Sequence, residues 1–195
     1  AVLLKSDGVL PFNTSGKNVA VIGPVAKTGA ILGNWRCYGK HEQTVTVFEG
    51  VKNLLENAEV EYAEGVNGEL TATFESGIAA AVKAAKGADA VILTLGEPQG
   101  DSGGGNSKLD LELPAVQYKL LDEVLKVNKN TAVLLFSGRP LAIKRLSETA
   151  PAILEVWQPG TEGGSAAANL LFGKAVPSGK LTMSFPAKTG QCPIY

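Results

Sequence analysis

Short runs of apolar residues alternate along this chain with longer segments in which apolar residues recur every three or four positions. The short runs predict strands that are buried on both faces, because both alternate sets of side chains are apolar. The clearest run is Ala-Val-Ile-Leu-Thr-Leu at residues 90–95. Strands are predicted at residues 18–24, 60–63, 90–95, 131–136, 152–157 and 181–185, of which 60–63 and 181–185 are short strands that also contain polar residues.

The longer segments predict amphipathic helices, because residues three or four positions apart share one face of a helix. In the segment 73–86, for example, Phe74, Ile78 and Ala81 fall on the same face. Pro114 suits the first position of the next helix. Helices are predicted at residues 49–56, 73–86, 114–126, 141–146 and 166–172.

Strands that alternate with helices predict an α/β fold. We expect a mostly parallel, roughly six-stranded sheet with helices on both faces, a flavodoxin-like α/β sandwich joined by right-handed crossovers. With 195 residues, the chain suits one domain with a sizeable core. A single domain over residues 1–195 is therefore expected.

Composition restricts the classes of partner. Hydrophobic residues make up 45% of the chain and charged residues 19%, which is typical of a globular protein. The formal net charge is −1, so there is no electrostatic reason to expect nucleic acid or an anionic membrane as a partner. No apolar run approaches the roughly 20 residues that span a bilayer. We expect neither a nucleic-acid partner nor a membrane partner.

The first residues and the two cysteines give little information about localisation or metal binding. Residues 1–12 lack the charged start and long apolar stretch of a signal peptide. They begin as if cut from a longer protein, which leaves export of that protein open. Cys37 and Cys192 are too few for a disulfide scaffold and fit no metal motif, so we expect buried or incidental thiols. No metal and no cofactor are expected.

The loop from Gly96 to Pro114 is the most informative segment for function. It is long, polar and rich in glycine, and it follows the strand 90–95, where open α/β sheets place their ligands. Its residues 100–108 lack the Gly-Lys-Ser/Thr ending of a phosphate-binding loop. The turn at 23–25 lacks the second glycine of a dinucleotide fingerprint. These failures disfavour nucleotide binding.

Carboxylates and aromatic residues remain as chemical groups, because the chain has one histidine, His41, and no Gly-x-Ser-x-Gly motif. Glycoside hydrolysis needs a carboxylic acid and a carboxylate on opposite sides of the scissile bond. Asp110 and Glu112 alternate with leucines and are expected to be solvated surface charges. Glu97 either hydrogen-bonds backbone amides of neighbouring turns or acts in catalysis. Asp101 has the best chance of reaching a ligand.

Two tryptophans have open roles at this point. Trp35 lies in the segment 33–39, in the loop after the first predicted strand. Its ring can stack on the face of a sugar or pin the loop to the core. Trp157 ends a buried strand and is expected in the core or in a domain contact.

Several short motifs follow one another along nearly the whole chain. They include Val-Ala-Val-Ile-Gly-Pro at 19–24, Gly-Asn-Trp at 33–35, Ser-Gly-Arg-Pro-Leu at 137–141, Ile-Leu-Glu-Val-Trp-Gln-Pro-Gly-Thr-Glu-Gly-Gly at 153–164 and Pro-Ser-Gly-Lys-Leu at 177–181. In this order and spacing, the chain resembles the C-terminal α/β-sandwich domain of glycoside hydrolase family 3, which includes β-glucosidases and β-xylosidases.

The resemblance implies two catalytic groups, and neither is evident here. The family's nucleophile is an aspartate in a preceding barrel domain, which these 195 residues do not contain. The acid/base of many bacterial members is a glutamate in a Ser-Gly-Glu context, on the loop that follows the strand 90–95. Here Ser102 and Gly103 are followed by Gly104, so the expected carboxyl group is missing. Natural loss, transfer of the role to a neighbour such as Asp101, and an engineered change remain open.

The resemblance therefore implies the cleft-completing domain of a retaining exo-β-glycosidase, with a β-linked oligosaccharide or glycoside as substrate. Its partner would be the N-terminal barrel domain, and the parent protein would be periplasmic or secreted. The alternative is a non-catalytic carbohydrate-binding or structural module of the same fold. The expected substrate-binding residues are Trp35, Glu97, Asp101, Ser102, Gly103 and Gly104, with Asp101 as the one catalytic candidate.

Overall fold

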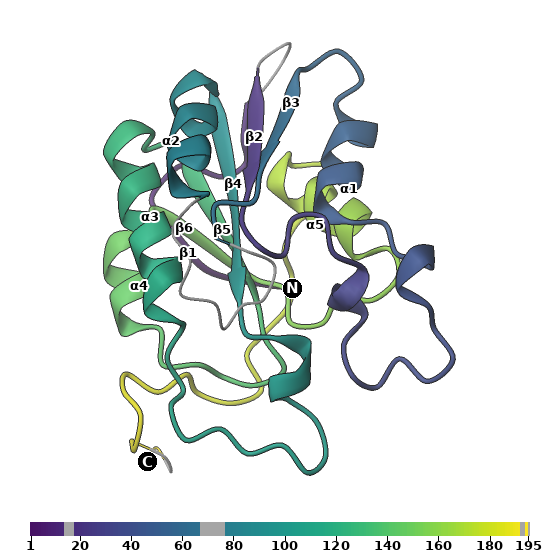
Figure 1. The fold of residues 1–195 in the computed structure, drawn as a ribbon, viewed down its shortest axis with the longest axis vertical. Helices are drawn as coiled ribbons and strands as arrows, with labels where there is room; N and C mark the ends of the chain where they lie inside the picture. Colours follow the sequence, from purple (N-terminus) through teal and green to yellow (C-terminus); the bar gives the residue numbers. More distant parts are fainter. Residues whose placement is uncertain (14–17, 67–76, 192–193, 195) are drawn as a thin grey trace.

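The computed structural model describes the chain except for residues 14–17, 67–76, 192–193 and 195. The described residues form a six-stranded sheet in the order β1-β6-β5-β4-β2-β3 (Figure 1). Only β1 is antiparallel to its neighbour, which confirms the predicted mostly parallel sheet. The strands are β1 Val2–Ser6, β2 Val19–Ile22, β3 Val60–Ala63, β4 Ala90–Gly96, β5 Thr131–Phe136 and β6 Ala152–Glu155.

Helices cover both faces of the sheet, as predicted. One face packs against α2, α3 and α4, and the opposite face packs against α1 and α5 (Figure 1). The helices are α1 Val47–Leu54, α2 Ile78–Gly87, α3 Ala115–Val127, α4 Lys144–Thr149 and α5 Gly163–Leu171. Three short 3-10 helices lie in the loops, η1 Gly29–Leu32, η2 His41–Gln43 and η3 Gln99–Asp101.

Strand β4 shows why the sequence of a central strand is a nearly continuous apolar run. Val91 and Leu93 belong to the core beneath α2 and α3, whereas Ala90 and Ile92 belong to the core beneath α1 and α5. Every residue of β4 is buried. Because both faces are covered, neither alternate set of side chains can be polar without a buried partner.

Helix α1 begins two residues before its predicted start because of its cap. The Thr46 hydroxyl accepts a hydrogen bond from the Glu49 amide at 3.3 Å, and the Glu49 carboxylate accepts one from the Thr46 amide at 2.9 Å. This reciprocal capping box satisfies amides that the first turn leaves free. The apolar spacing alone does not mark that start.

Other helix ends also differ from the predictions. Helix α4 begins at Lys144 instead of residue 141, because 141–143 is a buried non-helical segment. Helix α5 begins at Gly163 instead of residue 166. The predicted helix 73–86 corresponds to α2, and its residues 73–76 lie outside the described part of the chain.

The predicted strand at 181–185 is wrong, and β1 takes the sheet edge instead. Residues 181–185 have no strand pairing, while β1 lies antiparallel to β6. The alternation of apolar and polar residues at 181–185 has another cause. Phe185 packs against the Trp157 ring, with ring centroids 5.7 Å apart, whereas Met183 is exposed.

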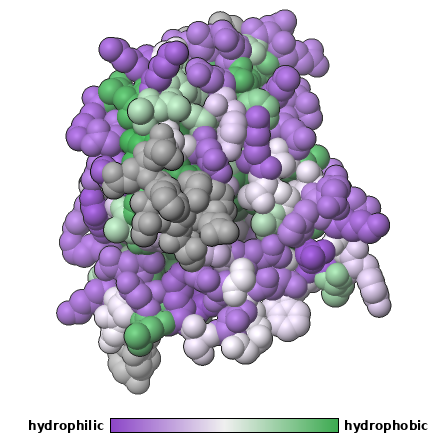
Figure 2. Space-filling view, viewed as in Figure 1, coloured by the Kyte–Doolittle hydropathy of each residue, from purple (hydrophilic) through white to green (hydrophobic). Residues whose placement is uncertain are grey.

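The face of the molecule in Figure 2 and the lengths of the described helices bear on membrane association. Figure 2 shows a face that is mostly hydrophilic, with apolar residues in scattered patches. Among the residues that the structure describes, no helix is both long and apolar enough to cross a bilayer.

The strand order places a topological switch point between β2 and β4. The chain crosses from β2 to β3 at one edge of the sheet and then returns to β4 on the other side of β2. Connections that leave neighbouring strands in opposite directions open a crevice at the carboxyl ends of those strands. A ligand site is therefore expected at the loops that follow β2 and β4.

Candidate functional site

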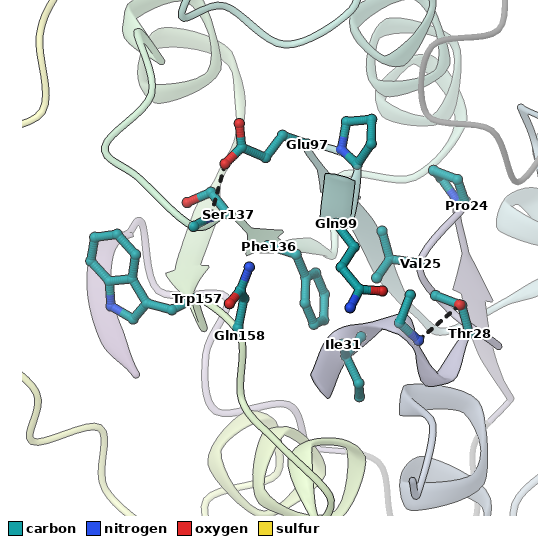
Figure 3. A pocket seen from close by; sticks show the side chains of 13 residues that line it. Pro24, Val25, Thr28, Ile31, Glu97, Gln99, Phe136, Ser137, Trp157 and Gln158 are labelled. Atoms are coloured by element: carbon teal, nitrogen blue, oxygen red, sulfur yellow. Dashed lines mark hydrogen bonds between the residues drawn. The ribbon is translucent and has the colours of Figure 1, made fainter. Parts of the chain in front are cut away.

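A pocket of about 300 Å³ lies at the carboxyl ends of the strands (Figure 3). Phe136 lies between the side chains of Gln99 and Gln158, and Trp157 lies on the side opposite Val25 (Figure 3). The pocket is lined by Pro24, Val25, Thr28, Ala30 and Ile31 after β2, Glu97, Pro98 and Gln99 after β4, Phe136, Ser137 and Gly138 at the end of β5, and Trp157 and Gln158 after β6.

Trp157 has an unusual backbone at the wall of this pocket. Its φ is 56°, in the left-handed region that bulky residues rarely adopt. Its amide donates a hydrogen bond of 2.8 Å to Oε1 of Glu155, two residues earlier. This bond and the contact with the Phe185 ring hold the turn at Trp157 beside the pocket.

Glu155 is a fully buried carboxyl group at the end of β6. Burial raises the pKa of Glu155 to about 8, although the hydrogen bonds from Trp157 and Ser137 act in the opposite direction. The Ser137 hydroxyl lies 3.4 Å from Oε1, while Oε2 has no hydrogen-bond partner among the described residues. A pKa near 8 means that Glu155 is mostly protonated at neutral pH.

Glu97 lies at the start of the loop and is only 5% exposed. Its Oε1 accepts a hydrogen bond of 2.9 Å from the amide of Gly138, so the expected bond to a neighbouring turn is present. Its Oε2 lies 3.5 Å from Nζ of Lys108 and 3.4 Å from Nε of Arg139. Two cations therefore compensate this buried carboxylate at the edge of the pocket.

Asp101 takes part in the same charge cluster. Its Oδ2 lies 2.8 Å from Nζ of Lys108, and its backbone carbonyl accepts a hydrogen bond from Arg139. Lys108 thus joins Glu97 at the start of the loop to Asp101 in η3. The Asp101 carboxylate is therefore engaged in an ion pair with Lys108.

Ser102 is a buried junction between loops. Its hydroxyl accepts a hydrogen bond of 3.0 Å from Nε2 of Gln158. Its backbone carbonyl accepts hydrogen bonds from the side-chain amides of Asn34 and Asn106. Gly103 follows with φ at 106°, a conformation that suits glycine.

Gly104 and Trp35 face each other beside the pocket. A Cβ atom added to Gly104 would lie 3.6 Å from Cζ2 of the indole, which is ordinary contact distance. Trp35 is 75% exposed, so its ring is not pinned into the core. The structure thus brings together the two residues that the sequence placed on separate loops, and no carboxyl group stands between them.

Asp110 and Glu112 lie at the surface, in agreement with the expectation of solvated charges. The hydrogen bond from the Glu112 amide lowers the pKa of Asp110 most, and the hydrogen bond from the Thr189 hydroxyl lowers it further. Cys37 is exposed and unpaired, and Cys192 lies outside the described residues. Within the described part of the chain, no group of His, Cys, Asp and Glu side chains could hold a metal ion.

Sequence reasoning missed several residues that shape this site, namely Asn34, Lys108, Arg139, Glu155 and Gln158. A charged residue inside the apolar run 152–157 was a usable signal for Glu155, because a glutamate there has to be protonated or paired. The partners of the polar loop residues have no comparable signal. They lie 38 to 68 positions away along the chain.

Comparison with known proteins decides the family. The whole chain, residues 1–195, matches the family described as Glycosyl hydrolase family 3 C-terminal domain. The chain belongs to this family. The β-glucosidase from Listeria innocua has the same fold, with a TM-score of 0.89 and 38% identity over 100% of this chain and 26% of that one.

Relatives with assigned activities agree with this glycoside hydrolase family 3 membership. A β-xylosidase of Formosa agariphila is 38% identical over 99% of the chain, and a periplasmic β-glucosidase of Salmonella typhimurium is 37% identical over 100% of it. The chain spans 28% of the length of each relative. These matches confirm the family resemblance and the α/β-sandwich fold, and they cover a domain of larger enzymes.

Proposed function

We propose that this chain completes the substrate cleft of a retaining exo-β-glycosidase, together with a barrel domain of the same polypeptide. The observation that carries the proposal is the loop 97–108, which is held beside an exposed tryptophan at the carboxyl ends of the strands. The relatives of known activity are glycosidases about four times as long as this chain. The substrate class is a β-linked oligosaccharide or glycoside.

The reaction is a double displacement. An aspartate of the barrel attacks the anomeric carbon, and an acid on the loop 97–108 protonates the departing oxygen. A glycosyl–enzyme ester forms as the glycosidic bond breaks, and water then releases the sugar while the proton returns to the loop group. These 195 residues contribute the leaving-group side of the cleft.

The site residues take different parts in this proposal. Trp35 offers an exposed ring on which the leaving-group sugar stacks. Gly103 and Gly104 form the backbone that faces the substrate, and the buried Ser102 beside them holds it in place through Gln158 and Asn34. Glu97 and Asp101 hold the loop through their ion pairs with Lys108.

A non-catalytic module of the same fold is the second candidate, and one observation favours it. Gly104 has no carboxyl group, and Asp101, its nearest acidic substitute along the loop, is engaged by Lys108. Without a proton donor, the cleft could bind sugar or support the barrel without assisting departure of the leaving group.

The test restores the missing acid in the full-length parent. Gly104→Glu should raise turnover on substrates with poor leaving groups by about 10²–10⁴-fold, the usual value of general acid catalysis. Activated aryl glycosides need less proton assistance and should change less. Gly104→Gln is the matched control, because it has the same shape without the acid.

Asp101→Asn in the parent separates the candidates. If this change abolishes activity while Gly104→Glu adds nothing, Asp101 or another group already serves as the acid. If the parent is inactive and neither change has an effect, the domain is a binding or structural module, and the catalytic proposal is wrong.

A further inference from the structure

Two loops from different strands meet at the site through side-chain amides. We call residues 33–38 the tryptophan loop and residues 97–108 the glycine loop. The Asn34 side-chain amide donates to the carbonyl of Ser102 in the glycine loop. In the opposite direction, the Gln99 side-chain amide donates to the carbonyl of Gly33 at 2.5 Å. Each loop thus supplies one donor and one backbone acceptor to the other.

The hydrogen bond from Asn34 to Ser102 lies next to Trp35 and Gly104 in the two loops. Asn34 precedes Trp35 in the chain, and Ser102 is two residues before Gly104. A Cβ atom added to Gly103 would lie 3.1 Å from Nδ2 of Asn34, so the Asn34 amide rests against the Ser102–Gly103 peptide. A side chain at position 104 would begin 3.6 Å from the Trp35 ring.

Core packing does not hold the Trp35 ring in this position. Trp35 is 75% exposed, and Tyr38 in the same loop is 100% exposed. An exposed indole keeps one position only if its backbone is fixed by polar contacts nearby. The Asn34 amide makes such a contact to the glycine loop from the residue adjacent to Trp35.

We propose that Asn34 is a positioning residue, which fixes Trp35 relative to residue 104 by holding the Ser102 carbonyl. This inference rests on the proposed function for its catalytic meaning. An aromatic ring and the loop backbone opposite it hold one sugar in a fixed place only if their separation is constant. Asn34 helps to set that separation through the hydrogen bond that lies nearer to Trp35 and residue 104.

A second donor to the Ser102 carbonyl, Asn106, allows a matched control variant. Asn106 also donates to this carbonyl, at 3.0 Å, but it belongs to the glycine loop itself. Asn106→Ala removes a donor from the same acceptor and leaves the link between the loops intact. Asn34→Ala removes one of the two hydrogen bonds between the loops and leaves the Gln99–Gly33 bond. Asn34→Asp keeps the shape but replaces the donor with an oxygen that repels the carbonyl.

Fluorine NMR measures the position of Trp35 without any substrate. The chain has two tryptophans, so 5-fluorotryptophan labelling gives two signals, which Trp35→Phe and Trp157→Phe assign. Asn34→Ala and Asn34→Asp should shift and narrow the Trp35 signal toward that of a mobile exposed indole. The Trp157 signal should keep its position and thereby report an intact fold. Asn106→Ala should leave both signals in place.

An unchanged Trp35 signal in both Asn34 variants would overturn the proposal, and so would an equal change in Asn106→Ala. If Asn34→Ala also displaced the Trp157 signal, the Trp35 signal of Asn34→Asp would be measured instead, because the Gln99–Gly33 hydrogen bond is still present in that variant. A Trp35 signal unchanged in that folded variant would again overturn the proposal.

Kinetics in the full-length parent then test the link to function separately. Asn34→Ala should lower kcat/KM for a β-linked disaccharide about fivefold, the equivalent of one hydrogen bond, mainly through KM. In a Trp35→Ala background it should have no further effect. If the NMR signal moves but the disaccharide kinetics do not, the positioning role stands and the proposed role of Trp35 in substrate binding is wrong.

Discussion

Gly104 lies opposite the indole of Trp35, with room between them for a Cβ atom. A Cβ atom on Gly104 would stand 3.6 Å from Cζ2 and 3.7 Å from Cη2 of the ring. Gly104 does not have the positive φ that Gly103 and Gly105 on either side of it have. The backbone therefore does not require glycine at this position, although it favours glycine at the neighbouring ones.

The first prediction compares alanine at these two adjacent positions. Gly104→Ala should keep the free energy of unfolding within about 0.5 kcal/mol of the original, because a methyl group meets only ordinary contacts. Gly103→Ala should lower it by about 2 kcal/mol, because φ at 106° strains a residue with a Cβ atom. Urea unfolding of both variants tests this. Equal losses would contradict the conformational difference.

The central strands of the sheet were predictable because they are buried on both faces, whereas Glu61 in the edge strand β3 is exposed. The strands predicted at 60–63 and 131–136 match β3 and β5 residue for residue. Burial of both alternate sets leaves a continuous apolar run, which is a strong local signal. The alternating pattern at 181–185 is a weaker signal, and it failed, since Phe185 packs against Trp157 while Met183 is exposed and the segment pairs with no strand.

The position of the site could be predicted, but its internal contacts could not. A polar loop after a buried strand of an α/β sheet marks the ligand edge, so the region around Asp101 was found from local pattern. The Asn34 contact to Ser102 joins residues 68 positions apart, and the Arg139 contact to Asp101 joins residues 38 apart. Only the folded sheet brings these strand ends together.

The charge cluster should be a stabilising element of the loop. Lys108→Met should lower the free energy of unfolding by about 2 kcal/mol, because it leaves the buried Glu97 carboxylate with Arg139 as its remaining cation. Lys144→Met is the matched control, because Lys144 pairs with Glu148 at an exposed position and should change stability by less than about 0.5 kcal/mol. Thermal unfolding of both variants measures the difference. Similar effects would mean that Glu97 does not depend on Lys108.

The isolated chain should fold and yet show no turnover of aryl β-glycosides. The proposed function places the nucleophile in another domain, and Gly104 supplies no carboxyl group. One carboxyl group of a pair cannot carry out a double displacement. Purified chain with a cooperative thermal transition and no release of aryl alcohol is the expected result. Turnover that disappears with Asp101→Asn would place a complete active site within these 195 residues.

The last prediction concerns pH and the buried Glu155. Its pKa rises from 4.5 to about 8 on folding, mainly because burial disfavours the charged form. Between these two pH values the folded chain retains a proton that the unfolded chain has released. The free energy of unfolding should therefore fall with rising pH in this window, by up to about 1.4 kcal/mol per pH unit from this group.

Glu155→Gln should remove that component of the pH dependence, because the amide is neutral at every pH and its oxygen can still accept from the Trp157 amide. Denaturant unfolding of both chains from pH 4.5 to pH 9 gives the measurement. The original chain should be progressively less stable relative to the glutamine variant until about pH 8, above which the difference should level off. Glu49→Gln is the control without a slope in this window, since hydrogen bonds from Thr46 lower the pKa of Glu49 and its contribution is lost only as pH falls below 4.5. A constant difference between the original chain and Glu155→Gln across the window would show that Glu155 is ionised in the folded protein, with the orphaned Oε2 satisfied by solvent.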